Sequence, residues 1–253
     1  MTPFGVLPVV GLQELVAQAD LQHRFDVKFL VPNTALGTLV HELARRHRDV
    51  RVLEIGTRRA HDCRSFYFDT ADLQLHRAQV QGRRRRIKVR TRTYGVDGRP
   101  FLELKARDDR GRTVKHRTAQ DLPDPTLLGP LTTGQLAVWR EAGTAAFCDL
   151  VHTATVSFDR TTLLIDALER MTIDRHVTVQ VSDTREDLGA HWSIVETKAL
   201  DPFGEVARTM RSLGYRPVAV SKYALALTAA HPHVRGNRWL HVLRQLRTAP
   251  PPR

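Results

Sequence analysis

The sequence contains few cysteines and no long apolar run. Among its 253 residues are two cysteines, Cys63 and Cys148, whose separation fits neither a metal-ligand motif nor a redox motif. This argues against a disulfide framework, and a reduced, cytoplasmic setting is expected. No apolar stretch approaches the roughly 20 residues that span a bilayer. The run "VLPVVGL" near the N-terminus lacks the preceding basic residues of a signal peptide, so no transmembrane segment is expected.

Acidic and aromatic residues are also scarce relative to basic ones. The formal net charge is +12, the pI is about 10.6, and aromatic residues make up 6% of the chain. Such a charge implies an acidic partner, which could be nucleic acid, an anionic membrane or a phosphorylated small molecule. The low aromatic fraction argues against binding to single-stranded nucleic acid by base stacking.

Hydrophobic periodicity predicts a strand-rich α+β fold in a single domain over residues 1–253. A Trp239-centred amphipathic stretch and a Pro-rich tail follow the last predicted helix. The predicted strands cover about 24–31, 64–70, 84–93, 101–107, 112–118, 150–158, 162–166, 171–181 and 191–198, and the predicted helices about 11–20, 34–47, 134–147, 202–213 and 221–230.

The stretch "GRRRRIKVRTRTYG" at residues 82–95 is basic but has the pattern of a strand. Side chains alternate between the two faces of a strand, so one face carries five basic residues and the other is mostly apolar or neutral. Three further predicted strands divide in the same way, with charged residues on one face. The five basic residues are Arg84, Arg86, Lys88, Arg90 and Arg92.

Two arrangements fit these two-faced strands: an open sheet with its charged face in water, or a closed barrel with the charges inside. The use of lysine favours the barrel. Six of the 39 basic residues are lysine, and five of the six lie in predicted strands, on the charged face wherever the register can be assigned. Lysine and arginine together, with a few carboxylates, suit a polyphosphate chain with a divalent metal.

Seven motifs occur along the chain in the order "RFDVKFLVP", "SFYFDT", "GRRRRIKVRTRTYG", "FLELK", "FDR", "VETK" and "SKYALAL". In this order they closely resemble the VTC domain, the polyphosphate-polymerase branch of the triphosphate tunnel metalloenzymes. The resemblance covers about residues 20–230, and leaves the N-terminal helix and the C-terminal tail peripheral. It implies a closed, mostly antiparallel β-barrel tunnel with a basic lumen and with helices packed outside.

The resemblance implies which residues bind phosphate and metal. Glu196 of "VETK" matches the metal-binding glutamate, Glu103 and Asp26 are weaker metal candidates, and Arg84 and Arg86 are expected at the tunnel entrance. The implied metal is Mn²⁺ or Mg²⁺. The implied phosphate ligands are Lys28, Arg90, Arg92, Lys105, Lys115, Arg160, Lys198, Ser221 and Lys222.

The activity implied by the resemblance is metal-dependent transfer of a phosphoryl group from ATP, or another triphosphate, to inorganic polyphosphate. Arg24 stands where the superfamily signature has its first glutamate, which removes one metal ligand. A triphosphate hydrolase and a non-catalytic polyphosphate-binding module remain alternatives. No specific nucleic acid is expected as a partner, although a nucleic-acid patch is the alternative for Arg83–Arg86. Association with a membrane protein or with further copies of the chain stays open.

Structural roles compete with functional ones at several of these residues. The charged face, with Arg90, Arg92 and Lys105, could simply be solvated. Glu196 could serve only as a salt-bridge partner of a basic neighbour. Ser221 could be no more than the N-cap of a helix.

Overall fold

The computed structural model describes residues 3–18, 25–95, 98–107, 113–141, 146–167, 169–201, 203–231, 233–234 and 236–250. The strands of this part of the chain are β1 Val9–Val10, β2 Phe25–Pro32, β3 Val50–Leu53, β4 His61–Thr70, β5 Arg86–Tyr94, β6 Phe101–Arg107, β7 Thr113–Ala119, β8 Leu150–Ile165, β9 Glu169–Val181, β10 Thr184–Asp187 and β11 Trp192–Ala199. The helices are α1 Leu12–Gln18, α2 Leu36–Arg46, α3 Gln74–Val80, α4 Thr133–Glu141, α5 Glu205–Ser212, α6 Lys222–Ala230 and α7 Asn237–Arg247.

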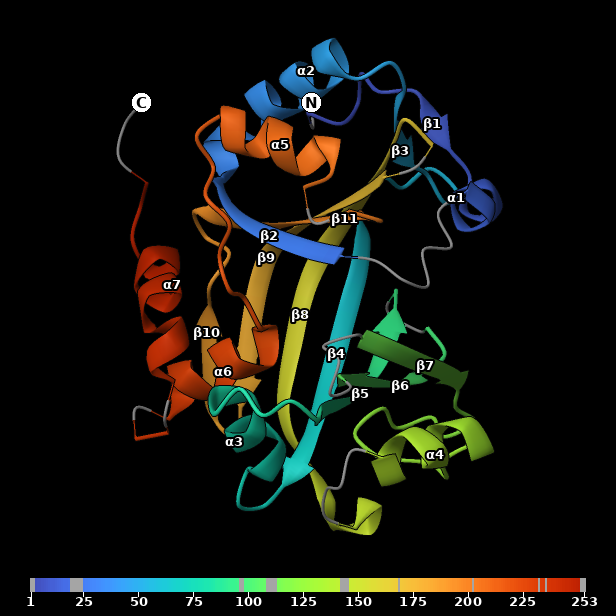
Figure 1. Cartoon of the computed structure of the whole chain (residues 1–253), viewed down its shortest axis with the longest axis vertical. Coiled ribbons are helices and arrows are strands. Elements are labelled where there is room, and N and C mark those ends of the chain that lie inside the picture. Colours follow the sequence, from blue (N-terminus) through green and yellow to red (C-terminus); the bar gives the residue numbers. More distant parts are fainter. Residues whose placement is uncertain are drawn as a thin grey trace.

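The described strands form one large, mostly antiparallel sheet (Figure 1). Its main path runs β2-β11-β9-β8-β4-β5-β6-β7, with β1, β3 and β10 attached at its sides. The two strands predicted at 150–158 and 162–166 are a single strand, β8, whose register against β9 shifts between Ser157 and Asp159. A turn predicted around Asp97-Gly98 includes Asp97, which is outside the described residues.

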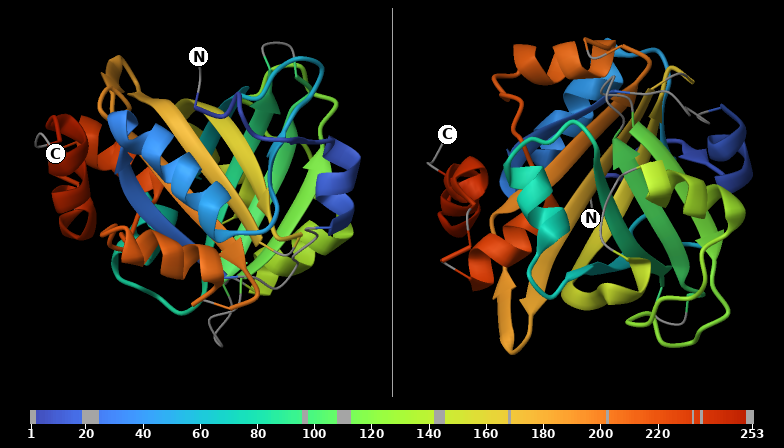
Figure 2. Two further views of the ribbon diagram at one scale, coloured as in Figure 1. Left: turned by 90° about the horizontal axis from the view of Figure 1, so that it is seen from above. Right: turned by 60° about the horizontal axis from the view of Figure 1, so that its bottom comes forward.

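The sheet is curved, but backbone hydrogen bonds do not close it. Among the described residues β2 and β7 end the strand path and do not pair with each other. The closed barrel expected from the sequence is therefore not confirmed, whereas the α+β class and the antiparallel pairing are. Figure 2 shows the strands wrapping around one side of the molecule rather than lying in a flat layer.

We call the side of the sheet that carries Lys28, Arg160 and Arg90 the inner face, and the opposite side the outer face. Helices α2 and α5 pack on the outer face against Phe29 and Val195. Helix α4 packs on another part of the outer face, where Trp139 meets side chains of β4, β5 and β6. These helices lie outside the sheet, as predicted.

Helix α6 departs from that prediction, because it packs on the inner face. Its side chains from Tyr223 to Thr228 are all buried, and they join a core cluster with Leu30, Ile194 and Phe158. These partners follow the alternation of the charged inner-face residues along their strands. The reason lies in the apolar "YALAL" of α6, because burying each of its two leucines, Leu225 and Leu227, contributes about 1.5–3 kcal/mol. One half of the inner face is thus apolar and covered, and the other half is charged.

Helix α3 was not predicted, and a buried carboxylate that contacts its first turn explains how it forms. Asp69 at the end of β4 is fully buried and accepts hydrogen bonds from the backbone amides of Leu75 and His76 at 2.8 Å. A carboxylate at the first turn satisfies amides that have no partner within a helix. The hydroxyl of Tyr223 on α6 donates to the same carboxylate at 2.7 Å. Asp69 therefore joins β4, α3 and α6.

Candidate phosphate-binding face

The charged half of the inner face is organised around buried or half-buried carboxylates. Asp174 on β9 is fully buried and accepts two hydrogen bonds from Arg160, at 2.7 and 2.8 Å, and one from Lys222 at 2.6 Å. Burial raises the pKa of Asp174, but the charges of Arg160 and Lys222 outweigh it and hold this pKa below its ordinary value. The carboxylate fixes the position of two cations that come from different elements.

Glu103 on β6 holds a second group of cations. Its Oε2 atom accepts from Nε and Nη2 of Arg90 at 2.8 and 2.6 Å, and its Oε1 atom lies 2.7 Å from Nζ of Lys115 and 3.8 Å from Nε of Arg117. Burial raises the pKa of Glu103, yet the neighbouring arginines and Lys115 hold it well below its ordinary value. Since both oxygens face cations, Glu103 fits an anchoring role better than the metal-ligand role suggested for it.

Glu196 on β11 and Asp26 on β2 form the third acidic centre. Glu196 pairs with Lys198, and its Oε2 atom lies 3.8 Å from Nζ of Lys28. Asp26 accepts from Lys105 of β6 at 3.0 Å. Burial and the negative charge of Glu196 raise the pKa of Asp26. The positive charges of the neighbouring lysines outweigh both effects and hold this pKa below its ordinary value. The two carboxylates are thus close enough to act on each other electrostatically.

Arg92 lies deepest among the predicted phosphate ligands. Its side chain is buried, its Nε atom donates to Ser65 at 3.0 Å, and its guanidinium lies 5.7 Å from the ring centre of Phe158. No carboxylate partner of Arg92 is present within the described part of the chain. Its remaining N–H groups are therefore suited to an anion that enters the inner face.

A cavity of about 240 Å³ opens beside these groups. Nζ of Lys88 lies in it, 3.2 Å from Oγ of Ser221, which also accepts from the amide of Ala224 as the N-cap of α6. Burial lowers the pKa of Lys88 well below its ordinary value, and the charges of Lys105 and Lys28 lower it further. Five basic residues line the cavity, and no acidic residue does: Lys28, Arg86, Lys88, Lys105 and Arg238.

The structure brings together most residues that the sequence predicted for the site. Lys28, Arg90, Arg92, Lys105, Lys115, Arg160, Glu196, Lys198, Ser221 and Lys222 all belong to the inner-face groups described above. Arg84 does not join them: it is exposed and precedes β5, while Arg86 lines the cavity.

Sequence reasoning missed Asp174, Arg117 and Arg238. The alternation in β9 could have revealed Asp174, because it shares a face with Thr172 and opposes Met171 and Ile173. Arg117 follows the same alternation from Lys115. Arg238 has no such signal, since only the packing of α7 brings it to the cavity.

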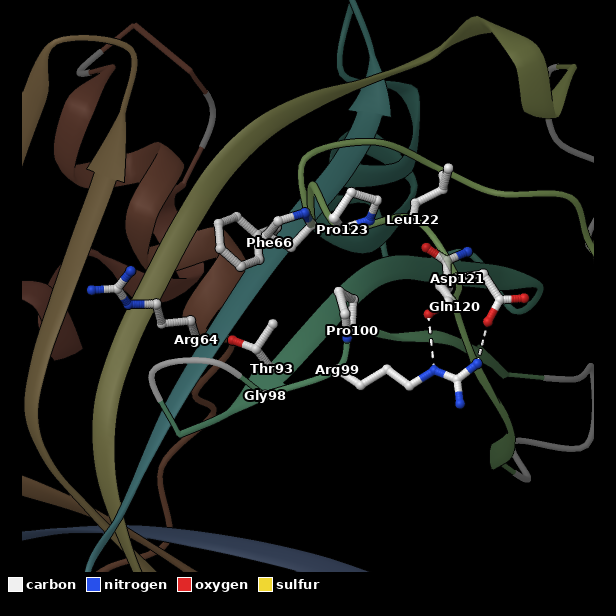
Figure 3. A pocket seen from close by; sticks show the side chains of 11 residues that line it. Arg64, Phe66, Thr93, Gly98, Arg99, Pro100, Gln120, Asp121, Leu122 and Pro123 are labelled. Carbon is white, nitrogen blue, oxygen red and sulfur yellow. Dashed lines mark hydrogen bonds and ion pairs between the residues drawn. The ribbon is translucent and has the colours of Figure 1, made fainter.

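A second pocket of about 560 Å³ lies on the outer face (Figure 3). Phe66 and three prolines supply its apolar walls, and Arg64 contributes a charge. Arg99 at its rim is already engaged, because it pairs with Asp121 and donates to the carbonyl of Gln120 at 3.2 Å. This pocket lacks the convergent cations of the inner face, so its chemistry does not fit a polyanion.

A possible metal-binding group occurs elsewhere in the described residues, at His47, Asp166 and Glu205. His47 already contacts Asp166 at 3.0 Å and Thr209 at 3.2 Å through its two ring nitrogens. The group joins the end of α2 to α5, away from the inner-face cations. A metal ion bound by this group would therefore not contact a phosphate bound among the inner-face cations.

The model of the VTC domain family matches residues 23–231. The chain belongs to the VTC domain family. This confirms the resemblance drawn from the seven motifs. A search of curated proteins found no match, and no helix among the described residues is both long and apolar enough to cross a membrane.

Solved structures similar to this VTC-domain chain have low sequence identity to it. A candidate adenylate cyclase from Bacillus halodurans has a TM-score of 0.54 and 15% identity, over 79% of this chain and 94% of that one. The Hippeastrum protein HpAC1, described as a candidate adenylyl cyclase with a dominant triphosphatase activity, has a TM-score of 0.47 and 16% identity, over 81% and 96%. At 15% identity the likeness to the Bacillus halodurans protein concerns the fold alone.

Proposed function

We propose that this protein binds triphosphate and polyphosphate on its inner face and transfers the γ-phosphoryl group of ATP to a growing polyphosphate chain. The observation that carries the proposal is the cavity lined by five basic residues and no acidic one. Like charges are held close together there at an energetic cost, which a bound polyanion removes. Membership of the VTC domain family supports the same ligand.

Residues with different partners take different parts in this proposal. Arg90, Lys115, Arg160 and Lys222 are fixed by Glu103 and Asp174, so they present a rigid array of donors. A rigid array costs little reorganisation when charge develops on the transferring phosphoryl group. Arg92 and Lys88, which have no carboxylate partner among the described residues, provide the surplus positive charge.

The residues present fit a divalent cation at Glu196 and Asp26. Their carboxylates lie on the same face of paired strands and act on each other electrostatically. Mg²⁺ and Mn²⁺ prefer oxygen ligands from one or two carboxylates, with phosphate and water completing the shell. When bound, the cation supplies charge neutralisation at the donor phosphates. Lys28 and Lys198, which now pair with Glu196, would then be released to phosphate oxygens.

The reaction needs no protein nucleophile. A terminal oxygen of the acceptor phosphate attacks the γ-phosphorus of ATP, the bond from that phosphorus to the β-bridging oxygen breaks, and ADP leaves. The inner-face cations align donor and acceptor and neutralise the charge spread over the equatorial oxygens. Water could replace the acceptor on the same face, which would make the protein a triphosphate hydrolase.

The test is incubation of the purified protein with ATP and either Mn²⁺ or Mg²⁺, followed by gel sizing of polyphosphate and an assay for orthophosphate. Long polyphosphate is the expected result. Orthophosphate alone would assign the hydrolase reaction instead, and polyphosphate binding without turnover would assign a binding module. If polyphosphate does not bind, or if duplex DNA at equal phosphate displaces it fully, the proposal is wrong.

A further inference from the structure

Arg238 reaches the basic cavity from a part of the chain outside the family match. It is the second residue of α7, Asn237–Arg247, whereas the match ends at residue 231. Within the cavity it faces the group formed by Lys28, Lys88 and Lys105, which come from β2, β5 and β6. The cavity is therefore completed by a helix that the family motifs do not include.

Helix α7 is firmly attached, so the place of Arg238 is determined by packing. Trp239, which also lines the cavity, is buried in the same core cluster as α6. Arg247 at the other end forms two hydrogen bonds with Glu186, at 2.6 and 2.7 Å. Just after the helix, the carbonyl of Thr248 accepts from the indole of Trp192 at 2.8 Å. These contacts hold both ends of α7.

Charge distinguishes this cavity from the rest of the inner face. Glu103 and Asp174 bind cations outside the cavity, whereas Asp26 pairs with Lys105 and Glu196 lies near Lys28, two of the lining lysines. None of these carboxylates lines the cavity itself. Arg238 and Lys88 have no carboxylate partner in the described ranges. A divalent cation prefers carboxylate oxygens, none of which lines the cavity, and it is repelled by the positive side chains there. An anion in the cavity therefore binds without metal.

We propose that the cavity binds the polyphosphate chain itself, free of metal, and that Arg238 is a phosphate-binding residue of this subsite. Metal-bound donor phosphates then occupy the side of Glu196 and Asp26, and the polymer occupies the side of α7. This inference rests on the proposed function and adds which side of the inner face holds the donor phosphates and which side holds the polymer. Arginine suits the role because its planar guanidinium grips phosphate oxygens in pairs.

The test measures binding of long-chain polyphosphate and of tripolyphosphate in EDTA, with wild type, Arg238→Ala and Arg238→Lys. Arg244→Ala is the matched control, because Arg244 is exposed on the same helix and does not line the cavity. Arg238→Ala should weaken long-chain binding about tenfold and tripolyphosphate binding clearly less. Arg238→Lys should restore part of the loss, and Arg244→Ala should bind long chains like wild type.

Equal affinities of Arg238→Ala and Arg244→Ala for the long chain would overturn the inference. So would an equal loss for the long and the short ligand, because Arg238 would then not be reserved for the polymer. Both results leave the proposed function intact as long as wild type binds polyphosphate. If wild type itself binds no polyphosphate, the proposed function fails first. Melting temperatures of all variants confirm that each protein is folded.

Discussion

Nζ of Lys105 on β6 lies 3.0 Å from Oδ2 of Asp26 on β2, although these strands stand near opposite ends of the sheet path. The contact crosses the inner face, where the backbone does not close the sheet. An ion pair between side chains thus connects strands near the two ends of the strand path, which backbone hydrogen bonds would join in a closed barrel. Because Lys105 is 43% exposed on its side chain, a ligand can reach this ion pair and compete for it.

Arg92→Ala tests whether polyphosphate binds on the inner face. The change removes a buried guanidinium that has no carboxylate partner among the described residues, and charged hydrogen bonds contribute roughly 1.5–3 kcal/mol each. We expect polyphosphate affinity to fall about tenfold to a hundredfold, as measured by titration in EDTA. The control is Arg45→Ala on the outer helix α2, where Arg45 pairs with Glu42. Equal losses in the two variants would indicate diffuse surface binding instead.

Glu196→Gln tests the acidic centre. The substitution keeps the shape of the side chain and removes a charge that pairs with Lys198 and Lys28. Metal-dependent turnover of ATP should be lost. Metal-free polyphosphate binding should be retained or strengthened, because the side chain at position 196 no longer competes with phosphate for the two lysines. Glu42→Gln on α2 is the matched control and should preserve turnover. Full activity of Glu196→Gln with Mn²⁺ and Mg²⁺ would show that Glu196 does not bind the metal.

Asp174→Asn tests the anchoring role of the buried carboxylate. The variant leaves Arg160 and Lys222 without their counter-charge, and removing one member of a buried ion pair costs about 3 kcal/mol. The free energy of unfolding, measured by urea denaturation at neutral pH, should fall by about that amount. Since the pKa of Asp174 is lowered in the folded protein, this stabilisation exists above the unfolded pKa and is lost as pH falls through the folded pKa. The gap between wild type and variant should therefore narrow only in strong acid.

The lowered pKa of Lys115 predicts how polyphosphate binding responds to pH. Burial lowers the pKa of this lysine to about 8, so the amine begins to lose its charge just above neutral pH. Polyphosphate affinity should fall as pH rises through 8, and binding near pH 8 should take up protons, measurable by calorimetry in buffers of different ionisation enthalpy. Lys115→Arg keeps the charge and should weaken this dependence, and Lys198, whose pKa burial also lowers to about 8, should account for the part that remains. An unchanged pH profile in Lys115→Arg would assign the effect to another group.

The lowered pKa of Lys115 also makes the free energy of unfolding depend on pH in a defined direction. Between the folded pKa of about 8 and the ordinary value of 10.5, the unfolded chain binds more protons than the folded one. The contribution of Lys115 to stability therefore rises with pH across this window. The free energy of unfolding, measured at pH 7 and pH 10, should therefore rise more for wild type than for Lys115→Arg.

Local patterns in the sequence predicted the strands of the main sheet path and their charged faces, but not the short strands β1, β3 and β10. Alternation in β5 and β11 placed Arg90, Arg92 and Glu196 on one side because successive side chains of a strand point to opposite faces. The β-branched and aromatic residues between them fixed the other side as core. The six lysines, five of them in strands, pointed to the same face. These are local properties, so they could be read from the chain.

Long-range packing sets which carboxylate meets which cation and how the inner face is divided. Asp174 meets Lys222 across 48 residues, and Lys88 meets Ser221 across 133; such pairings depend on sheet order and curvature. Burial of the apolar helix α6 on the inner face closed half of the space that the sequence suggested was an open lumen. The packing of α7 then placed Arg238 at the remaining cavity, where long-range packing, rather than any local pattern, determines the site.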